Sequence, residues 1–165
     1  MSVVKSKRNE SRLEVLVQAD RLAKSLTDLM VRDFGIKDPE MVARRKYAFG
    51  KDRVENASRY RFLISETKTS LSQDVRLLTY HIESANAIFP TTLSECDKRR
   101  ELQDLALGNC AHIRHELQRF CDVFDVRIGD YRIPVAELDR EVALLKKWRQ
   151  KDSSVRRKLQ ARGDV

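Results

Sequence analysis

Glycine and proline are scarce in this sequence, which has five glycines and three prolines among 165 residues. No run alternates apolar and polar residues at period two between turn signals, so little in the pattern indicates β-sheet. No window approaches the roughly 18 apolar residues of a membrane-spanning helix. The opening residues, MSVVKSKRNE, lack the apolar run of a signal peptide. We therefore expect a helical protein that works in the cytoplasm and does not enter a membrane.

Cysteine is also rare, and its pattern argues against a disulfide framework. The three cysteines, Cys96, Cys110 and Cys121, are odd in number, and the last two lie on or beside an apolar helical stripe. Free cysteine behaves as a small apolar residue and is among the most buried residue types. We interpret these residues as buried thiols in a reducing compartment.

Positive charge is the strongest compositional signal. The formal net charge is +8 and the isoelectric point is near 9.6, which favours an acidic partner such as nucleic acid. Lysine and arginine exceed aspartate and glutamate by three in residues 1–12 and again by three in residues 151–165. Most of the excess therefore lies in the two ends of the chain.

The segment 88–124 carries the longest helical pattern. A Pro-Thr-Thr turn precedes it, and Thr91, Thr92 or Ser94 can cap the helix. Its apolar residues recur at steps of three and four, which places them on one side of a helix; they are Leu102, Ala106, Cys110, Ile113, Leu117, Phe120 and Phe124. Gly108 in the middle of this helix predicts either a close approach of another helix or a tolerated cost.

Three further amphipathic segments complete the pattern. The first helix is expected from Asn9 or Ser11 to Gly35, and the second from Ser58 to about Ala87. The last should begin after Gly129, with Pro134 in its first turn, and end within residues 149–151. Residues 36–57 read as a connector that holds a short helix. The residues outside these helices read as a flexible basic N-terminus, 1–10, and a basic C-terminal tail, 152–165, with too few apolar residues to pack.

Four amphipathic helices with mostly short connections predict an all-α, antiparallel up-down-up-down four-helix bundle over residues 11–151. The length suits a single domain with a core of its own. No internal repeat of 20–50 residues is visible.

Signatures of catalysis are missing. A carboxylate-bridged metal site in a bundle needs paired Glu-x-x-His motifs, and none occurs. The nearest ligand cluster is His112, His115 and Glu116, which we interpret as a satisfied surface or interface group because no partner motif completes a site. No nucleophile elbow or phosphate-binding glycine loop is present. We therefore predict a protein that is not an enzyme and that uses no metal or cofactor.

Basic residues are the remaining functional signal, because arginine and lysine can neutralise phosphates with little sequence specificity. An ordinary solvated bundle surface explains the same charges, since 35% of the residues are charged. The candidate nucleic-acid or partner-binding residues are Arg44, Arg45, Lys46, Lys98, Arg99, Arg100, Arg114, Arg119, Lys146, Lys147, Arg149, Arg156, Arg157 and Lys158.

Four short motifs resemble a known family. They are ANAIFPTT at 85–92, KRRELQDLALGNC at 98–110, ELQ at 116–118 and ALLKKWR at 143–149. In these segments the chain is similar to the accessory variability determinant (Avd-like) proteins of diversity-generating retroelements, which belong with the ribosomal intervening-sequence four-helix bundles. The resemblance covers about residues 58–150 and, more loosely, 11–34. The 36–57 connector and the basic ends depart from the compact family pattern.

The resemblance implies a small basic homo-oligomer, a barrel-like pentamer, without catalytic residues. Such a protein binds the reverse transcriptase of the element and its template RNA or cDNA, and supports mutagenic reverse transcription. A ribosome-associated or RNA-associated bundle without a reverse transcriptase partner is the alternative, and a metal-dependent bundle enzyme is a third possibility.

Overall fold

The computed structural model describes residues 13–36, 53–124 and 126–162, and within helix α3 the side chains from residue 58 onward. These residues form four α-helices and one short 3-10 helix, with no strand among them; the elements are α1 (Glu14–Val31), η1 (Asp33–Gly35), α3 (Arg53–Ala87), α4 (Leu93–Val123) and α5 (Ile128–Arg162). None of these helices is long and apolar enough to span a membrane. The all-α prediction is confirmed.

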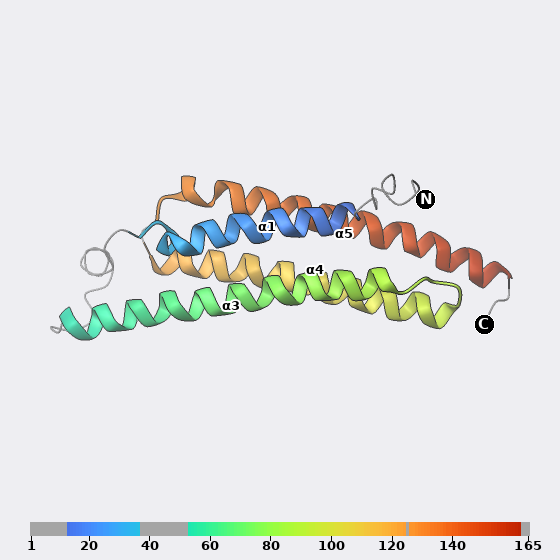
Figure 1. The fold of residues 1–165 in the computed structure, drawn as a ribbon, viewed down its shortest axis with the longest axis horizontal. Coiled ribbons are helices and arrows are strands. Elements are labelled where there is room, and N and C mark those ends of the chain that lie inside the picture. Colours follow the sequence, from blue (N-terminus) through green and yellow to red (C-terminus); the bar gives the residue numbers. More distant parts are fainter. Residues whose placement is uncertain (1–12, 37–52, 125, 163–165) are drawn as a thin grey trace, which may run out of the picture.

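The four helices lie side by side in an elongated bundle (Figure 1). The main contacts join α3 to α4, α4 to α5, α5 to α1 and α1 to α3, which closes a square of helices. Each neighbouring pair is antiparallel. The start of α4 meets the end of α5 at Asp97 and Arg156, and the end of α1 meets α3 where Ser72 contacts Met30. The predicted up-down-up-down bundle is therefore confirmed.

The core contains the apolar stripe predicted for α4. Ala106, Cys110, Ile113 and the residues that continue the stripe to Phe124 are buried, and Leu102 packs against them half-buried. In α1 the buried apolar side chains recur at steps of four and three from Val15 through Ala19, Leu22 and Leu26 to Leu29, while Leu16 and Met30 are half-buried.

Aromatic side chains close the end of the bundle where α1 and α4 finish. The ring centroids of Phe34 and Phe120 lie 4.1 Å apart, those of Phe120 and Phe124 lie 4.3 Å apart, and Tyr60 meets Phe124 edge to face at 5.3 Å. The Tyr131 hydroxyl donates a hydrogen bond of 3.3 Å to the carbonyl oxygen of Phe34. We call these five residues the aromatic end; all five are buried.

The turn after α1 delivers Phe34 to this cluster. Asp33, Phe34 and Gly35 have φ values of 48°, 58° and 80°, so the chain passes through the left-handed region for three residues. Glycine adopts this conformation without steric cost. A Cβ on Gly35 would also lie 2.8 Å from an Oδ of Asp130. Gly35 therefore follows α1 as predicted, although the α-helix itself ends earlier, at Val31.

Helix α4 begins at the predicted turn. Thr92 is its N-cap, and the Glu95 backbone N–H donates to the Thr92 hydroxyl at 3.2 Å. The Glu95 carboxylate accepts in return from the backbone N–H groups of Thr91 and Thr92, at 2.8 and 3.0 Å. This reciprocal capping box satisfies donors that a helix start leaves without partners.

Three predicted helix starts are wrong. Helix α1 begins at Glu14, with Leu13 rather than Asn9 or Ser11 as its N-cap. Helix α3 begins at Arg53, five residues before the predicted Ser58. Helix α5 begins at Ile128, so Gly129 lies in its first turn and Pro134 lies inside it. Glycine is tolerated in the first turn, where the backbone N–H groups have no partner within the helix. The connector helix predicted near residues 39–50 and the flexible N-terminus predicted for residues 1–10 lie outside the described residues.

The predicted C-terminal tail is helical up to Arg162, which corrects the expected helix end at residues 149–151. Leu159 is buried, Asp152 contacts Arg99, and Arg156 contacts Asp97. Contacts with α4 therefore continue past residue 151, where the predicted helix ended.

Gly108 does not mark a close helix contact. A Cβ placed on this residue would have no other atom within 4 Å. Of the two explanations offered by the sequence, the structure supports a tolerated glycine on an open face of α4.

Candidate functional site

The predicted binding residues separate into three groups. Arg44, Arg45 and Lys46 lie outside the described residues. Five others form ion pairs within the bundle; they are Arg99, Arg114, Arg119, Arg149 and Arg156. The remaining six are exposed and have no described carboxylate within ion-pair distance; they are Lys98, Arg100, Lys146, Lys147, Arg157 and Lys158.

Arg99 is mostly buried and joins three elements. Its Nε lies 2.8 Å from an Oδ of Asp152 in α5, and the exposed fractions of these two side chains are 13% and 17%. One of its terminal nitrogens donates 2.8 Å to the carbonyl oxygen of Ile88, before the turn that leads into α4. Its guanidinium lies 5.0 Å from the ring centroid of Trp148. These contacts make Arg99 a structural anchor, with little of its side chain left for a partner.

Gln103 supports the same anchor from one turn further along α4. It is fully buried, and its Nε2 donates 2.6 Å to Asp152. Asp152 therefore has two contacts with α4, a hydrogen bond from Gln103 and an ion pair with Arg99. The polar side chains Arg99, Gln103 and Asp152 and the ring of Trp148 hold the last part of α5 against the start of α4.

Exposed ion pairs extend this attachment along the α4 and α5 interface. Arg156 pairs with Asp97 at 2.7 Å, Arg149 with Asp104 at 2.7 Å, and Arg114 with Asp139 at 2.5 Å. The guanidinium of Arg156 lowers the pKa of Asp97, mainly through their hydrogen bond. Pairs this exposed contribute little stability each, but they occupy arginines that the sequence assigned to a partner.

A polar network lies between α3 and α4. The Nδ1 of His112 is 2.6 Å from an Oδ of Asp74, and Nδ1 of His81 is 2.9 Å from Oδ1 of Asn109. Arg119 donates 2.7 Å to Glu116. The cluster predicted as a satisfied interface group thus includes a direct contact of His112 with α3. Among the described residues, no three His, Cys, Asp or Glu side chains gather closely enough to hold a metal ion.

One buried carboxyl group in α5 has no partner. Glu141 is fully buried, and neither of its side-chain oxygens has a hydrogen-bond partner. Burial raises the pKa of Glu141 to about 8. Burial also raises the pKa of the Cys110 thiol to about 12, with a smaller contribution from Glu141. Glu141 is therefore largely protonated at neutral pH.

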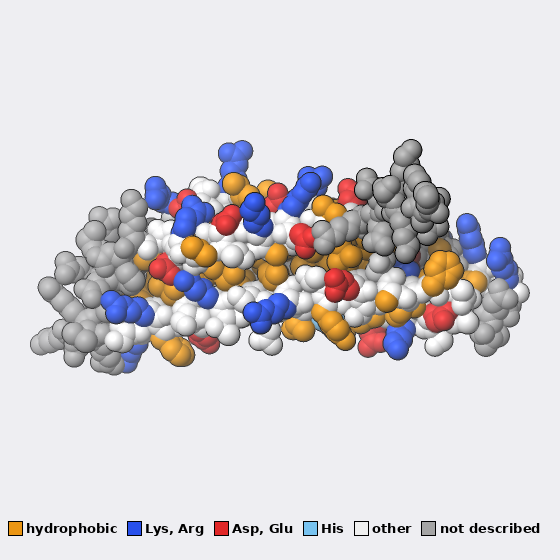
Figure 2. Space-filling model, viewed as in Figure 1, with side chains coloured by type: hydrophobic (Ala, Val, Ile, Leu, Met, Phe, Trp, Pro, Cys, Tyr) orange, Lys and Arg blue, Asp and Glu red, His pale blue; other side chains and the backbone are white. Residues whose placement is uncertain are grey.

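Four of the six exposed candidate cations lie at one end of the bundle, while other exposed lysines and arginines occur along its length (Figure 2). Arg156 pairs with Asp97, which places Lys98 and Arg100 near the start of α4 at the same end of the bundle as Arg157 and Lys158 near the end of α5. Lys151 is also exposed there. We call these five residues the basic end, and Figure 2 shows Lys and Arg side chains on that end of the molecule. Nearby carboxylates of Asp97 and Asp152 are already paired.

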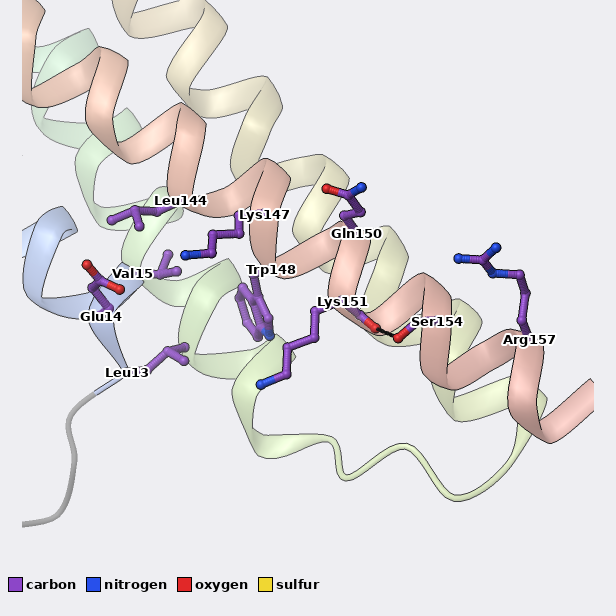
Figure 3. A pocket seen from close by; sticks show the side chains of 10 residues that line it. All are labelled: Leu13, Glu14, Val15, Leu144, Lys147, Trp148, Gln150, Lys151, Ser154 and Arg157. Carbon is purple, nitrogen blue, oxygen red and sulfur yellow. Dashed lines mark hydrogen bonds between the residues drawn. The ribbon is translucent and has the colours of Figure 1, made fainter.

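A groove of about 500 Å³ adjoins the basic end, between the first residues of α1 and the second half of α5 (Figure 3). Leu13, Val15, Leu144 and Trp148 provide its apolar lining, and Lys147, Lys151 and Arg157 are its cations. Sequence reasoning missed this groove because it ended α5 too early. The signal was present: Leu159 follows Leu138 and Leu145 at a multiple of seven residues.

No family model, curated protein or solved structure matches this chain. Its functional assignment therefore depends on the short motifs named above and on the geometry of the bundle.

Proposed function

We propose that this protein is a non-enzymatic accessory protein of a diversity-generating retroelement. It binds a reverse transcriptase and its RNA template or cDNA, and supports mutagenic reverse transcription. By resemblance it works in the cytoplasm as a homo-oligomer, with a pentamer as the expected size.

The basic end is the observation that carries this proposal. The carboxylates Asp97 and Asp152 are occupied by Arg156 and Arg99, and Glu101 lies beside Arg100, so the exposed cations of the basic end outnumber the carboxylates left to balance them. Phosphate groups are the natural complement to such a surface. The fold agrees with the family that the motifs resemble, since it is a four-helix bundle.

This geometry supports recognition of the nucleic-acid backbone. Lysines and arginines on helix surfaces contact phosphates and carry little sequence information. Assembly into a ring would repeat the basic end around one axis and strengthen its field. We therefore expect RNA binding that weakens with salt. It should favour structured RNA and show no preference for a particular sequence.

The test is RNA binding as a function of salt, with two charge-matched variants. Lys98→Glu/Arg100→Glu alters the basic end, and Arg132→Glu/Arg140→Glu alters two exposed arginines elsewhere on α5. Affinity of the unaltered protein for an RNA hairpin should fall steeply between about 50 and 200 mM KCl. The first variant should flatten the slope by about 1.5, from two lost phosphate contacts, and the second should change it little. Equal loss in both variants, or affinity unaffected by salt, would contradict the phosphate surface.

The protein partner and the assembly need separate measurements. A reverse transcriptase gene and an imperfect repeat pair beside this gene favour the retroelement, whereas an rRNA locus favours the ribosome-associated alternative. Co-purification with the neighbouring reverse transcriptase then tests the partner directly. Light scattering in solution gives the assembly mass, and a monomer would remove the ring from the proposal.

A further inference from the structure

One face of α5 continues beyond the helix that covers it. Glu137, Leu144, Lys151 and Lys158 are seven residues apart and so lie on one side of α5. At Glu137 this side meets α1, because Gln18 donates 3.2 Å to the Glu137 carbonyl oxygen. At Leu144 it lines the groove together with Leu13. Since α1 begins at Glu14, no described helix covers the face at Lys151 and Lys158.

The uncovered face is apolar at its near end and basic at its far end. Figure 3 shows Leu13, Val15, Leu144 and Trp148 around the groove, with Lys151 and Arg157 beyond them on α5. Lys147 adds a third cation, and Glu14 is the one carboxylate among the described residues that line the groove. An occupant that matches this lining needs apolar side chains and negative charge on the same side.

Two observations favour a polypeptide from another molecule over the alternatives. Only 8% of Trp148 is exposed, so its ring offers no open face on which a nucleobase could stack. Residues 1–12 of this chain carry a net charge of +3, which does not complement a basic groove. The face of α5 at Lys151 and Lys158 lies in line with α1, which is the place of a helix in this bundle.

We propose that this groove docks an acidic amphipathic helix of a partner protein, end to end with α1. Apolar side chains of the partner contact Leu13, Leu144 and Trp148, and its carboxylates meet Lys151 and Lys158. Helix-in-groove docking of this kind reads apolar anchors at steps of three and four residues. The inference rests on the proposed function and deepens it, because it assigns the protein partner to a groove beside the basic end, with which it shares cations of α5 such as Lys151.

Trp148 makes the test direct, because it is the only tryptophan of the chain and it lines the groove. The probe is a synthetic helical peptide of about 18 residues, without tryptophan, that has leucines on one face and glutamates beside them. A peptide with lysine in place of each glutamate is the matched control. We expect the acidic peptide to shift the Trp148 emission saturably and the basic peptide to leave it unchanged.

Two variants with equal charge change separate the groove from the part of the basic end that lies on α4. Lys151→Glu/Lys158→Glu should lower the affinity for the acidic peptide about tenfold, because two attractive contacts become repulsive. Lys98→Glu/Lys146→Glu alters two lysines outside the groove. It should change the affinity for the peptide less than about twofold and lower the affinity for the RNA hairpin. Circular dichroism of both variants verifies that the helices remain.

The possible results distinguish the docked helix from its alternatives. No saturable shift with the acidic peptide, or equal peptide loss in both variants, overturns the docked helix. A Trp148 shift produced by the RNA hairpin instead would assign the groove to nucleic acid, and a shift that depends only on protein concentration would assign it to a second copy. If the unaltered protein bound the acidic peptide but not the RNA hairpin, that result would count against the phosphate surface alone.

Discussion

The aromatic end and the basic end of this bundle are held together by different interactions. Phe34, Phe120 and Phe124 stack on one another in a buried cluster at the first. Arg99 and Asp152 cross-link α4 and α5 at the second, where α1 no longer covers α5. Apolar packing completes the aromatic end, whereas polar contacts hold the basic end and leave a groove beside it.

This difference indicates where function can be placed without loss of the fold. At the aromatic end, almost any change removes buried area. At the basic end, a few charged side chains form ion pairs within the bundle. Their exposed neighbours can be substituted without loss of the fold. Residues next to one another in sequence, such as Arg99 and Arg100, therefore have different roles.

Phe120→Ala should produce the largest loss. Its ring lies between Phe34 and Phe124, so truncation leaves a cavity in a buried cluster. Loss of a buried phenylalanine typically costs about 3–5 kcal/mol. Denaturant unfolding followed by circular dichroism measures the change. Phe62→Ala is the control, since 66% of Phe62 is exposed, and its cost should stay within about 0.5 kcal/mol. Similar costs for both variants would show that the aromatic end is not tightly packed.

Glu141, which lies between the two ends of the bundle, should make the free energy of unfolding depend on pH. Its pKa is raised to about 8 in the folded protein from an ordinary 4.5, so the folded state holds a proton that the unfolded state releases. Its stabilising contribution is therefore complete below about pH 4.5 and is lost as the pH rises through about 8. Between about pH 6 and 7.5 the unfolding free energy should drop by roughly 2 kcal/mol, at ~1.4 kcal/mol per pH unit.

Glu141→Gln removes the titrating group with little change of shape. Unfolding curves at several pH values should show that this variant loses most of the slope in that window. A wild-type slope retained in Glu141→Gln would assign the pH dependence to another group.

Arg99→Ala tests the polar anchor of the basic end. The substitution leaves the Ile88 carbonyl oxygen without its donor and leaves Asp152 with Gln103 alone. Unsatisfied groups in a largely buried site cost about 1–3 kcal/mol. The emission of Trp148 should also change, because the guanidinium beside its ring is lost.

Arg100→Ala is the matched control, because Arg100 is exposed and has no described carboxylate partner within ion-pair distance. This substitution should change the free energy of unfolding by less than about 0.5 kcal/mol and should weaken RNA binding. If Arg99→Ala instead kept full stability and lost RNA binding, Arg99 would be a binding residue rather than an anchor.

The sequence predicted the bundle well because its apolar residues repeat with the period of a helix. The α4 stripe from Leu102 to Phe124 and the Thr92 cap are local patterns, and both were confirmed. Arg99 also carried a readable signal, since it lies seven residues before the buried Ala106 and therefore faces inward. The prediction grouped Arg99 with Lys98 and Arg100 as one basic run and so overlooked that Arg99 lies on the buried side of the helix.

The basic end and its groove could not be read in the same way. Arg156 finds Asp97 from 59 residues away, and Gln103 finds Asp152 from 49 residues away. Such distant pairs have no periodic signature, so the end of α5 read as a tail. The groove depends in addition on where α1 begins relative to α5, which is a property of two helices packed together.

Gly108→Ala should give the smallest change and the opposite sign. Gly108 lies within α4 between the two ends, and an added Cβ would meet no atom within 4 Å. Alanine should therefore raise the unfolding free energy by about 0.5–1 kcal/mol through its higher helix propensity. Thermal unfolding measures this gain, and mass and RNA affinity are measured beside it. Gain in stability with mass and affinity unchanged leaves the open face of α4 without a role in assembly. Gain in stability with loss of the oligomer would instead mean that another copy packs closely over Gly108, which would extend the functional surface from the basic end to the middle of α4.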